Sequence, residues 1–311
     1  MFETLFHADW SKDERKRWVA SAKKEPRGWK VSVPDQVAPT EIFLRQIVAA
    51  GKETRTLAGF DFPIGVPAAF AKAAKLESFP EALPKFGQGV WRDFYEVCND
   101  RSSISIHRPF YPNKPGGKRL DHLVAGLDFE SRDELLRVCE IGVPDRPAAC
   151  SLFWTLGAKQ VGKAAITGWK EILNPATQRG ALLWPFGGPL DELIKRKQLI
   201  IAETYPAEAY RHIGVKFRSS SKRSVEGRRQ QYAVLCAWAK RSGVHFEPQC
   251  QVEIESGFER CGAQGEDAFD ALIGLLGMID VADGRRAEGA PTHLYVRNWE
   301  GWILGQVSTN Y

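Results

Sequence analysis

The chain lacks the sequence marks of a zinc protein, a secreted protein and a membrane protein. Its six cysteines form no CxxC pair and no group with the six histidines, which argues against a zinc site and indicates reduced thiols. The N-terminal segment MFETLFHADW has neither the basic stretch nor the long apolar stretch of a signal peptide. No apolar run is long enough to cross a bilayer. We therefore expect a cytoplasmic protein with no membrane partner.

Sequence motifs for nucleotide binding are missing as well. The glycines of LGAKQVGKAAITG (156–168) match neither a P-loop nor a dinucleotide-binding fingerprint. The chain also has no internal repeat and no low-complexity segment. With 311 residues, 43% of them hydrophobic, it is long enough to bury a substantial core in one large domain or two small ones.

The net charge is only +5, so the overall charge alone does not argue for nucleic acid as a partner. Its distribution along the chain is uneven. Residues 195–229 hold ten Lys or Arg and three Glu, a net charge of +7 in one window. Such a basic segment can hold a polyanion, although a solvated surface segment would have the same composition.

The order of apolar runs predicts an α/β fold. Strands are expected at 4–9, 15–22 and 28–35, then a helix from Pro39 and Thr40 to Gly51, and then a strand at 55–61. Three strands in a meander followed by a helical crossover to a fourth strand are typical of an α/β protein.

The middle of the chain, about residues 68–197, is irregular and rich in Pro, Gly and Trp. We expect it to be a long insertion folded over one edge of the sheet, within a single domain whose core is 1–67 and 198–311. Regular patterns return with a strand at 197–206, a helix at 224–243 and a buried helix at 266–284. Residues 244–258 are ambiguous and fit an extended edge, and residues 293–304 are expected to form a hairpin.

Acidic residues stand at the ends of three of the apolar runs. Asp9 ends TLFHAD, Asp61 ends RTLAGFD, and Glu203 ends LIIAE. If the first two of these strands are parallel neighbours, Asp9 and Asp61 end side by side. Two such carboxylates repel each other in a partly dry cleft, and Mg²⁺ or Mn²⁺ between them would remove the repulsion. Taken singly, each aspartate also fits a turn or cap residue.

Two further aspartates lie on the expected C-terminal helix. The spacing of three between Asp267 and Asp270 places both on one helix face, near the N-terminus. The helix dipole favours acidic residues in a first turn. Asp267 and Asp270 could therefore also be residues that only stabilise the start of the helix. Asp270, however, is followed directly by a near-continuous apolar segment, which is not typical of a solvated face.

Clustered carboxylates with cations nearby predict phosphodiester chemistry. In two-metal sites, cations about 3.5–4 Å apart hold the attacking water and the leaving oxygen in line. The candidate catalytic residues are Asp9, Asp61, Glu203, Asp267 and Asp270. From the basic window, Lys222, Arg228 and Arg229 are the candidate phosphate-binding residues, because ammonium and guanidinium groups suit phosphate.

The motifs FDFPIG, QVGKAAITGW, LLWPF, AETYPAEAY, KRSVEGRR, EDAFDAL and EGWI together resemble the family catalogued as domain of unknown function 429 (DUF429), predicted nucleases of the ribonuclease H-like superfamily. The late DAFDA is most similar to the branch of the Holliday-junction resolvase RuvC. The resemblance spans nearly the full chain and is weakest over 70–150. It implies a mixed five-stranded sheet of order 3-2-1-4-5, flanked by helices, with the insertion between strands four and five.

The resemblance also implies roles for individual residues. Asp9, Asp61, Asp267 and Asp270 would be ligands of Mg²⁺ or Mn²⁺, and Glu203, in the ETYP motif, would stand near the site. The chain departs from the family pattern at Trp10, since a glycine often follows the aspartate of the first strand. An indole there could stack a base or narrow access, so Trp10 is a candidate substrate-binding residue.

Three functions follow from these observations. The first is a Mg²⁺- or Mn²⁺-dependent nuclease acting on DNA or RNA. The second is a catalytically silent nucleic-acid-binding or scaffolding module, in which tryptophans of the insertion could stack on single strands, although most of them are expected in the core. The third is a phosphotransferase like actin and the sugar kinases. It is disfavoured because ADWSKDERKR has no glycine for a phosphate-binding turn.

Overall fold

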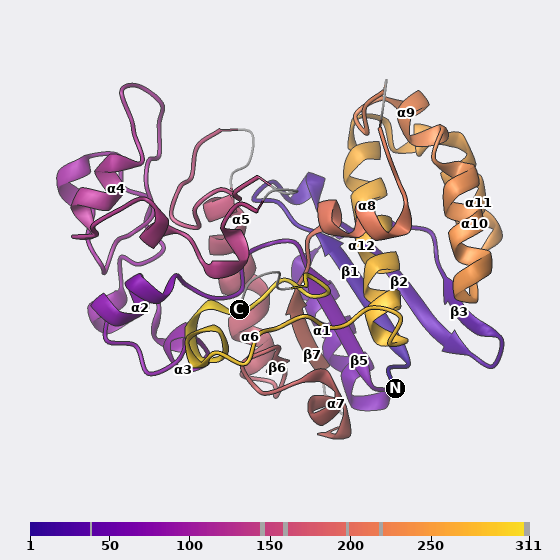
Figure 1. Cartoon of the computed structure of the whole chain (residues 1–311), viewed down its shortest axis with the longest axis horizontal. Helices are drawn as coiled ribbons and strands as arrows, with labels where there is room; N and C mark the ends of the chain where they lie inside the picture. Colours follow the sequence, from indigo (N-terminus) through magenta and orange to yellow (C-terminus); the bar gives the residue numbers. More distant parts are fainter. Residues whose placement is uncertain (38, 144–146, 158–160, 197–198, 218–219, 308–311) are drawn as a thin grey trace.

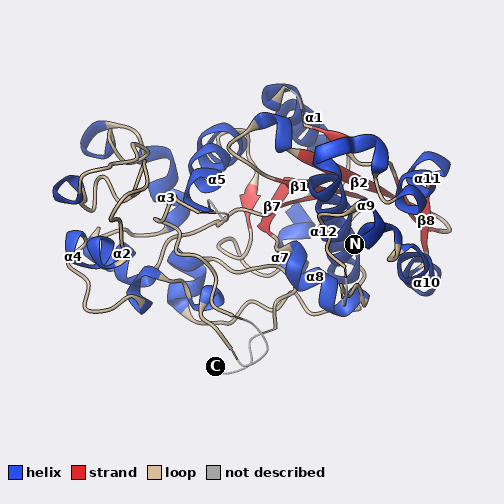
Figure 2. Cartoon of the chain, turned by 90° about the horizontal axis from the view of Figure 1, so that it is seen from above, coloured by secondary structure: helices blue, strands red, loops and turns tan. Residues whose placement is uncertain are grey.

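A central mixed sheet with helices on both faces organises the molecule (Figures 1 and 2). The computed structural model describes residues 1–37, 39–143, 147–157, 161–196, 199–217 and 220–307. This arrangement confirms the predicted α/β class. None of the helices in these ranges combines the length and the apolar character needed to cross a membrane.

Within the described ranges the sheet has eight strands, in the order β6-β7-β5-β1-β2-β3-β8 with β4 paired to β2. β1 runs antiparallel to β2, and β2 antiparallel to β3 and β4, whereas the other neighbours are parallel. The strands are β1 (Thr4–Asp9), β2 (Trp18–Glu25), β3 (Gly28–Val31), β4 (Asp35–Gln36), β5 (Thr56–Phe60), β6 (Leu182–Leu183), β7 (Leu199–Glu203) and β8 (Val244–Phe246).

This order differs from the predicted five-stranded sheet of order 3-2-1-4-5. β6, inside the insertion, extends one edge by pairing with β7, and β8 extends the other edge by pairing with β3. β6 and β8 are two and three residues long, and segments this short carry no readable alternation of apolar and polar residues.

The helices of the core are α1 (Thr40–Glu53), α8 (Pro206–Ile213), α9 (Val225–Arg229), α10 (Tyr232–Ser242), α11 (Pro248–Ser256) and α12 (Gly265–Ala282). Those of the insertion are α2 (Ala68–Ala73), α3 (Phe79–Ala82), α4 (Asp121–Gly126), α5 (Val161–Gly168), α6 (Asn174–Thr177) and α7 (Leu190–Leu193). The insertion helices α2, α3 and α4 occupy the side of the molecule opposite α10 and α11 (Figure 1).

Alternating side chains of the strands feed two apolar cores. Leu5, on β1, belongs to the core under α12, together with residues of α8 and α10. The next residue, Phe6, points to the other face and belongs to the core shared with α1 and the insertion. The insertion therefore shares an apolar core with the sheet.

Several predicted elements differ from the observed ones; the strand expected at 28–35, for example, is divided into β3 and β4. Residues 293–304 contain a π-helical turn, Val296–Glu300, and Ile303 forms an isolated bridge with Glu203 of β7. No two parts of this segment pair with each other as strands, so the hairpin prediction was wrong. The expected helix 224–243 is interrupted between α9 and α10. Residues 244–258 form the strand β8 and then the helix α11 instead of one extended edge.

The C-terminal ends of three parallel strands meet at one edge of the sheet. Ala8 of β1 pairs with Phe60 of β5, and Phe60 in turn pairs with Glu203 of β7. Asp9 and Asp61, which directly follow Ala8 and Phe60, therefore leave the sheet side by side, as expected for parallel neighbours.

Close packing of α12 on β1 fixes the helix over this edge. A Cβ atom on Gly274 would lie 2.0 Å from Cε1 of His7, so only glycine allows this approach. The buried His7 donates from Nδ1 to the carbonyl oxygen of Ala271 at 2.9 Å. Burial lowers the pKa of His7 to about 4, which keeps the ring neutral.

We expect Gly274→Ala to lower the free energy of unfolding by about 1–3 kcal/mol, because the added methyl group overpacks the contact with His7. Intrinsic helix propensity alone would give the opposite sign, since alanine is favoured over glycine by about 1 kcal/mol. Urea unfolding followed by circular dichroism measures the change. In a His7→Ala background the same substitution should cost less, and equal costs in both backgrounds would refute the contact.

Candidate active site: a cleft lined by carboxylates

A cleft of about 560 Å³ opens where β1, β5 and β7 end. All five acids singled out in the sequence line it, although they are spread over more than 260 positions of the chain. They are Asp9, Asp61, Glu203, Asp267 and Asp270. The parallel strand ends supply the first three, and the first turns of α12 supply the other two.

Asp9 and Asp61 form a carboxyl–carboxylate pair. Loss of solvation, and then the negative charge of Asp61, raise the pKa of Asp9 well above its ordinary value, and the hydrogen bond to Asp61 acts in the same direction. These shifts favour a protonated Asp9 that donates a hydrogen bond to the Asp61 carboxylate. Loss of solvation also raises the pKa of Asp61 to about 7, while the backbone N–H of Trp10, 2.7 Å from Asp61 Oδ1, opposes the rise.

Asp267 and Asp270 face the same cleft from α12. Loss of solvation raises the pKa of Asp267 to about 6, and the neighbouring Asp270 contributes to the rise while Lys16 opposes it. Asp270 is buried, and burial raises its pKa as well. The charges of Asp267 and Asp270 also act on Asp9, so the four aspartates behave as one electrostatic cluster.

Asp270 is compensated by partners from the chain itself. The hydroxyl of Tyr210, on α8, donates to Oδ1, and the ammonium group of Lys222 donates to Oδ2. Lys222 also lies 3.2 Å from Glu266. Burial acts to lower the pKa of Lys222, but Asp270 and Glu266 outweigh this effect and keep it above its ordinary value. Lys222 is therefore a counter-ion for the acids of α12.

The donor chemistry of the cleft fits a hard divalent cation. Mg²⁺ and Mn²⁺ prefer carboxylate oxygens, and four aspartates that raise one another's pKa values supply them. Across the residues that the structure describes, however, no three His, Cys, Asp or Glu side chains are grouped closely enough to hold a metal ion. The counter-ion Lys222 and the raised pKa of Asp9, which favours its protonated form, offset part of the negative charge in this arrangement.

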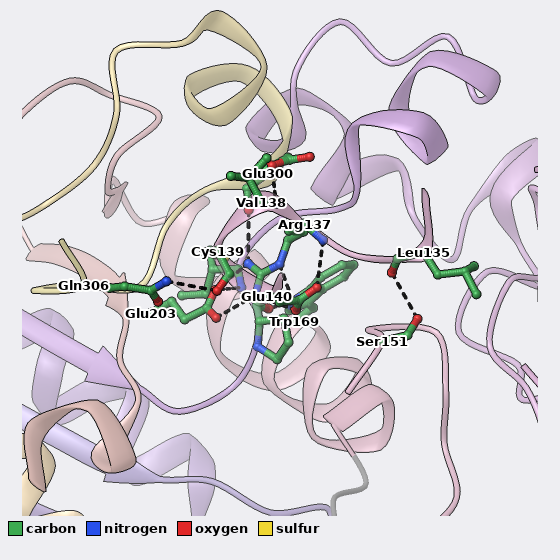
Figure 3. A network of polar contacts seen from close by, with 12 residues as sticks. Leu135, Arg137, Val138, Cys139, Glu140, Ser151, Trp169, Glu203, Glu300 and Gln306 are labelled. Atoms are coloured by element: carbon green, nitrogen blue, oxygen red, sulfur yellow. Dashed lines mark hydrogen bonds and ion pairs between the residues drawn. The ribbon is translucent and has the colours of Figure 1, made fainter. Parts of the chain in front are cut away.

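Glu203 lies at the wall of the cleft within a buried ion-pair network (Figure 3). Arg137, from the insertion, donates to both of its oxygens at 2.6 and 2.7 Å, and the N–H of Ile64 donates to Oε2 at 2.7 Å. The same guanidinium binds Glu140 at 2.9 Å. The sequence made Glu203 a candidate catalytic residue near the site, and the structure places it at the wall of the cleft with both oxygens bound by Arg137 of the insertion.

The predicted phosphate-binding arginines are turned to other partners. Arg228 is buried and donates to the carbonyl oxygens of Gly257 and Lys222 at 2.8 and 2.7 Å. Arg229 lies near Glu226 and Glu259. Neither arginine is among the residues that line the cleft, so Arg228 holds the Lys222 loop in place instead of facing a substrate.

Trp10 is also held in the interior. The residue is 5% exposed, and its ring lies beneath the guanidinium of Arg17 at 4.1 Å and makes edge contacts with Phe60 and Phe62. Its indole N–H donates to Thr167 at 3.1 Å. The ring is therefore not placed to stack a base, although Trp10 contributes to the wall of the cleft. Trp169 and Trp184 are fully buried too.

A family model described as "Protein of unknown function (DUF429)" matches residues 9–293. The chain belongs to the DUF429 family. The matched range includes every acid of the cleft, together with Arg137 and Lys222. No curated protein and no solved structure matches the chain.

Sequence reasoning missed two residues that shape the site. Tyr210 lies seven positions after Glu203 in the AETYPAEAY motif, and its place one helical turn into the helix that begins at Pro206 was a usable signal. Arg137 gave no such signal, because it lies in the irregular insertion, where no periodicity indicates which side chains are buried.

We expect Arg137→Met to lower the free energy of unfolding by about 3–5 kcal/mol, because Glu140 and Glu203 would remain buried without their cation. Chemical denaturation at pH 7.5 measures the loss. The matched control is Arg132→Met, which breaks the solvent-exposed pair with Asp121 in the same insertion and should leave stability almost unchanged. Similar losses in both variants would show that the buried network is not an anchor.

We expect Asp61→Asn to stabilise the protein at alkaline pH. The folded-state pKa is raised from 3.8 to about 7, so the wild type loses stability as the pH rises between these values. The variant avoids this loss and keeps an oxygen for the N–H of Trp10. At about 1.4 kcal/mol for each pKa unit, the gain at pH 8 is at most about 4 kcal/mol.

Thermal unfolding of both proteins in EDTA at pH 4.5 and pH 8 measures this effect. The difference in melting temperature between Asp61→Asn and the wild type should be larger at pH 8. Asp133→Asn, at an exposed position outside the cleft, should give the same difference at both pH values. A variant that is less stable than the wild type at pH 8 would instead make Asp61 a structural hydrogen-bonding group.

Proposed function

We propose that this DUF429 protein is a nuclease that hydrolyses phosphodiester bonds with Mg²⁺ or Mn²⁺. The observation that carries the proposal is the convergence of four aspartates from β1, β5 and α12 on one cleft, with pKa values raised by lost solvation and by one another. Perturbed carboxyl groups that share a cleft are typical of functional sites. A structural role alone would not require acids from three separate elements.

Asp9, Asp61, Asp267 and Asp270 would hold the cations in this function. Bound divalent ions would supply Lewis-acid activation of a phosphate and lower the pKa of a water molecule. The chain itself orients Asp61 through the N–H of Trp10 and Asp270 through the hydroxyl of Tyr210. The pair Asp9 and Asp61 can store one proton near neutral pH, and Lys222 and Tyr210 oppose the rise that burial causes in the pKa of Asp270.

The proposal includes membership of the ribonuclease H-like superfamily, nearest to its RuvC-like branch. Two features support this finer assignment. Within the larger sheet, the strands β3, β2, β1, β5 and β7 are consecutive neighbours, and aspartates follow directly at the ends of β1 and β5. The third carboxylate position comes from a late helix, α12, that packs over the same strands.

A nucleic-acid-binding module without catalysis is the second candidate. The ion pair between Lys222 and Asp270 favours it, because an internal counter-ion already balances the acid that a catalytic metal would bind. Binding that weakens with salt, without cleavage in Mg²⁺ or Mn²⁺, would select this function.

We expect Asp61→Asn and Asp270→Asn each to reduce cleavage about 100-fold or more, the range that single groups in such sites contribute. The assay uses labelled single-stranded, duplex and branched DNA and single-stranded RNA, with Mn²⁺. Asp133→Asn is the control and should cleave like the wild type. Cleavage that persists at the wild-type rate in both cleft variants would refute the nuclease.

A further inference from the structure

The row of strand ends at the cleft has a third member besides Asp9 and Asp61. β5 and β7 pair in parallel, with Phe60 opposite Glu203. The residues that follow these two, Asp61 and Thr204, are therefore neighbours. The N–H of Thr204 donates to the carbonyl oxygen of Phe60 at 2.8 Å, which continues the pairing by one residue. Thr204 thus stands in one row with the two aspartates, and all three line the cleft.

The hydroxyl group of Thr204 is buried and unpartnered. The residue is 5% exposed, and its Oγ1 atom makes no hydrogen bond to any residue that the structure describes. Its methyl group points toward Gly59 of β5, where an added Cβ atom would lie 2.6 Å from Cγ2. The methyl branch therefore packs on the sheet, which leaves the hydroxyl branch to the cleft. A buried polar group without a partner destabilises the free protein, and a ligand that binds it removes this cost.

A helix begins two residues after Thr204, with its N-terminus at the same wall of the cleft. α8 starts at Pro206, which has no N–H, and no side chain caps this end. The two N–H groups that follow Ala207 both donate to the carbonyl oxygen of Tyr205. Among the residues that the structure describes, none accepts a hydrogen bond from the N–H of Ala207. Ala207 also lines the cleft.

Two unused donors, the Thr204 hydroxyl and the Ala207 N–H, are therefore close together at one wall. Three residues of chain span at most about 11 Å. Two donors at a helix N-terminus suit acceptor oxygens, and the helix dipole favours oxygens that carry negative charge. The acidic residue of the first turn, Glu208, does not take this place, because it is paired with Arg286 at 3.2 Å.

We propose that the hydroxyl of Thr204 and the N–H of Ala207 form a binding site for a phosphate group beside Asp61. Oxygens of the phosphate would accept from both donors, which satisfies the buried hydroxyl, and their charge would lie at the N-terminus of α8. Cations on the neighbouring aspartates would offset the repulsion between the phosphate and these acids. We therefore expect phosphate to bind more tightly when a divalent cation is present.

This inference deepens the proposed function and rests on it for the identity of the ligand, a backbone phosphate of a nucleic-acid strand. A free phosphate compound offers the same chemistry, so the experiment includes both ligands. Because Thr204 is the neighbour of Asp61 in the row of strand ends, a phosphate held there would lie next to the acids that would bind the metal.

The test is Thr204→Val, which replaces the hydroxyl group with a methyl group, and Thr204→Ser is the conservative variant that keeps the hydroxyl. Thr155→Val is the matched control. Thr155 is also buried, but it is not among the residues that line the cleft, and it donates to the carbonyl oxygen of Pro112 at 2.7 Å.

Affinity for a labelled single-stranded oligonucleotide is measured by fluorescence anisotropy at several salt concentrations, in EDTA and in Ca²⁺, which binds carboxylate oxygens as Mg²⁺ does. Electrophoresis of the probe afterwards checks that it is intact. Thermal shifts with pyrophosphate and Ca²⁺ form a second arm. The melting temperature of each variant without ligand is the third measurement.

We expect Thr204→Val to bind the oligonucleotide in Ca²⁺ about tenfold more weakly than the wild type, the loss that one hydrogen bond to a charged group produces. The salt slope should not change, because no charge is removed. Thr204→Ser and Thr155→Val should bind like the wild type. Without ligand, Thr204→Val should melt at the wild-type temperature or above it, whereas Thr155→Val should melt below it, because only Thr155 loses a hydrogen bond.

The two ligands separate this site from the proposed function. Pyrophosphate stabilisation that is lost only in Thr204→Val, without oligonucleotide binding by the wild type, would support the site and reject nucleic acid as its ligand. Equal affinity of Thr204→Val and the wild type for both ligands would overturn the site and leave the nuclease proposal intact. No response of the wild type to either ligand would overturn the site and contradict the nuclease as well.

Two results on the variants would also overturn the site. One is a Thr204→Val protein that melts as far below the wild type as Thr155→Val does, which would show that the hydroxyl has a partner within the chain. The other is an equal loss of binding in Thr204→Val and Thr204→Ser, which would trace the effect to side-chain packing and not to the hydroxyl.

Discussion

The site depends on one constraint, the burial of acidic side chains at the ends of β1 and β5. The parallel pairing of these strands leaves Asp9 and Asp61 side by side, and the close contact of Gly274 with His7 brings α12 and its two aspartates to the same edge. Such a cluster is costly unless protons or cations balance it. The raised pKa of Asp9, which favours its protonated form, and the ammonium group of Lys222 supply part of that balance within the chain.

A second buried charge network explains how the insertion contributes to the cleft. Arg137 joins Glu203, at the end of β7, to Glu140 and to the carbonyl oxygen of Glu300 (Figure 3). The Glu300 side chain in turn accepts from the N–H groups of Ala68 and Val138. One guanidinium therefore connects the sheet, the insertion and the C-terminal turn. Buried pairs of this kind are sensitive to the loss of one partner, so the insertion and the cleft wall are stabilised together.

The sequence was sufficient to predict where a site residue lies when a local pattern of apolar residues determines its position. Asp9 and Asp61 follow long apolar runs, and Asp270 precedes one, so their convergence could be predicted from strand order and helix periodicity. The roles of Glu203, Arg228 and Trp10 could not, because each depends on a partner far along the chain, namely Arg137, Gly257 and Thr167. The expected hairpin at 293–304 was wrong for a similar reason. The Glu300 side chain there binds amides of two distant segments, and these contacts outweigh the local pattern.

The placement of Lys222 determines what the cleft can do. Its ammonium group satisfies Asp270 and Glu266, so a divalent ion that binds Asp270 competes with a cation already in place. Metal binding in this protein would therefore have a smaller net benefit than in a cleft of unpaired acids, because it exchanges one counter-ion for another. A phosphate that approaches with the metal would in turn offer the displaced ammonium group a new partner. In the proposed function the same lysine would thus link the charge balance of the acids to the binding of an anionic substrate.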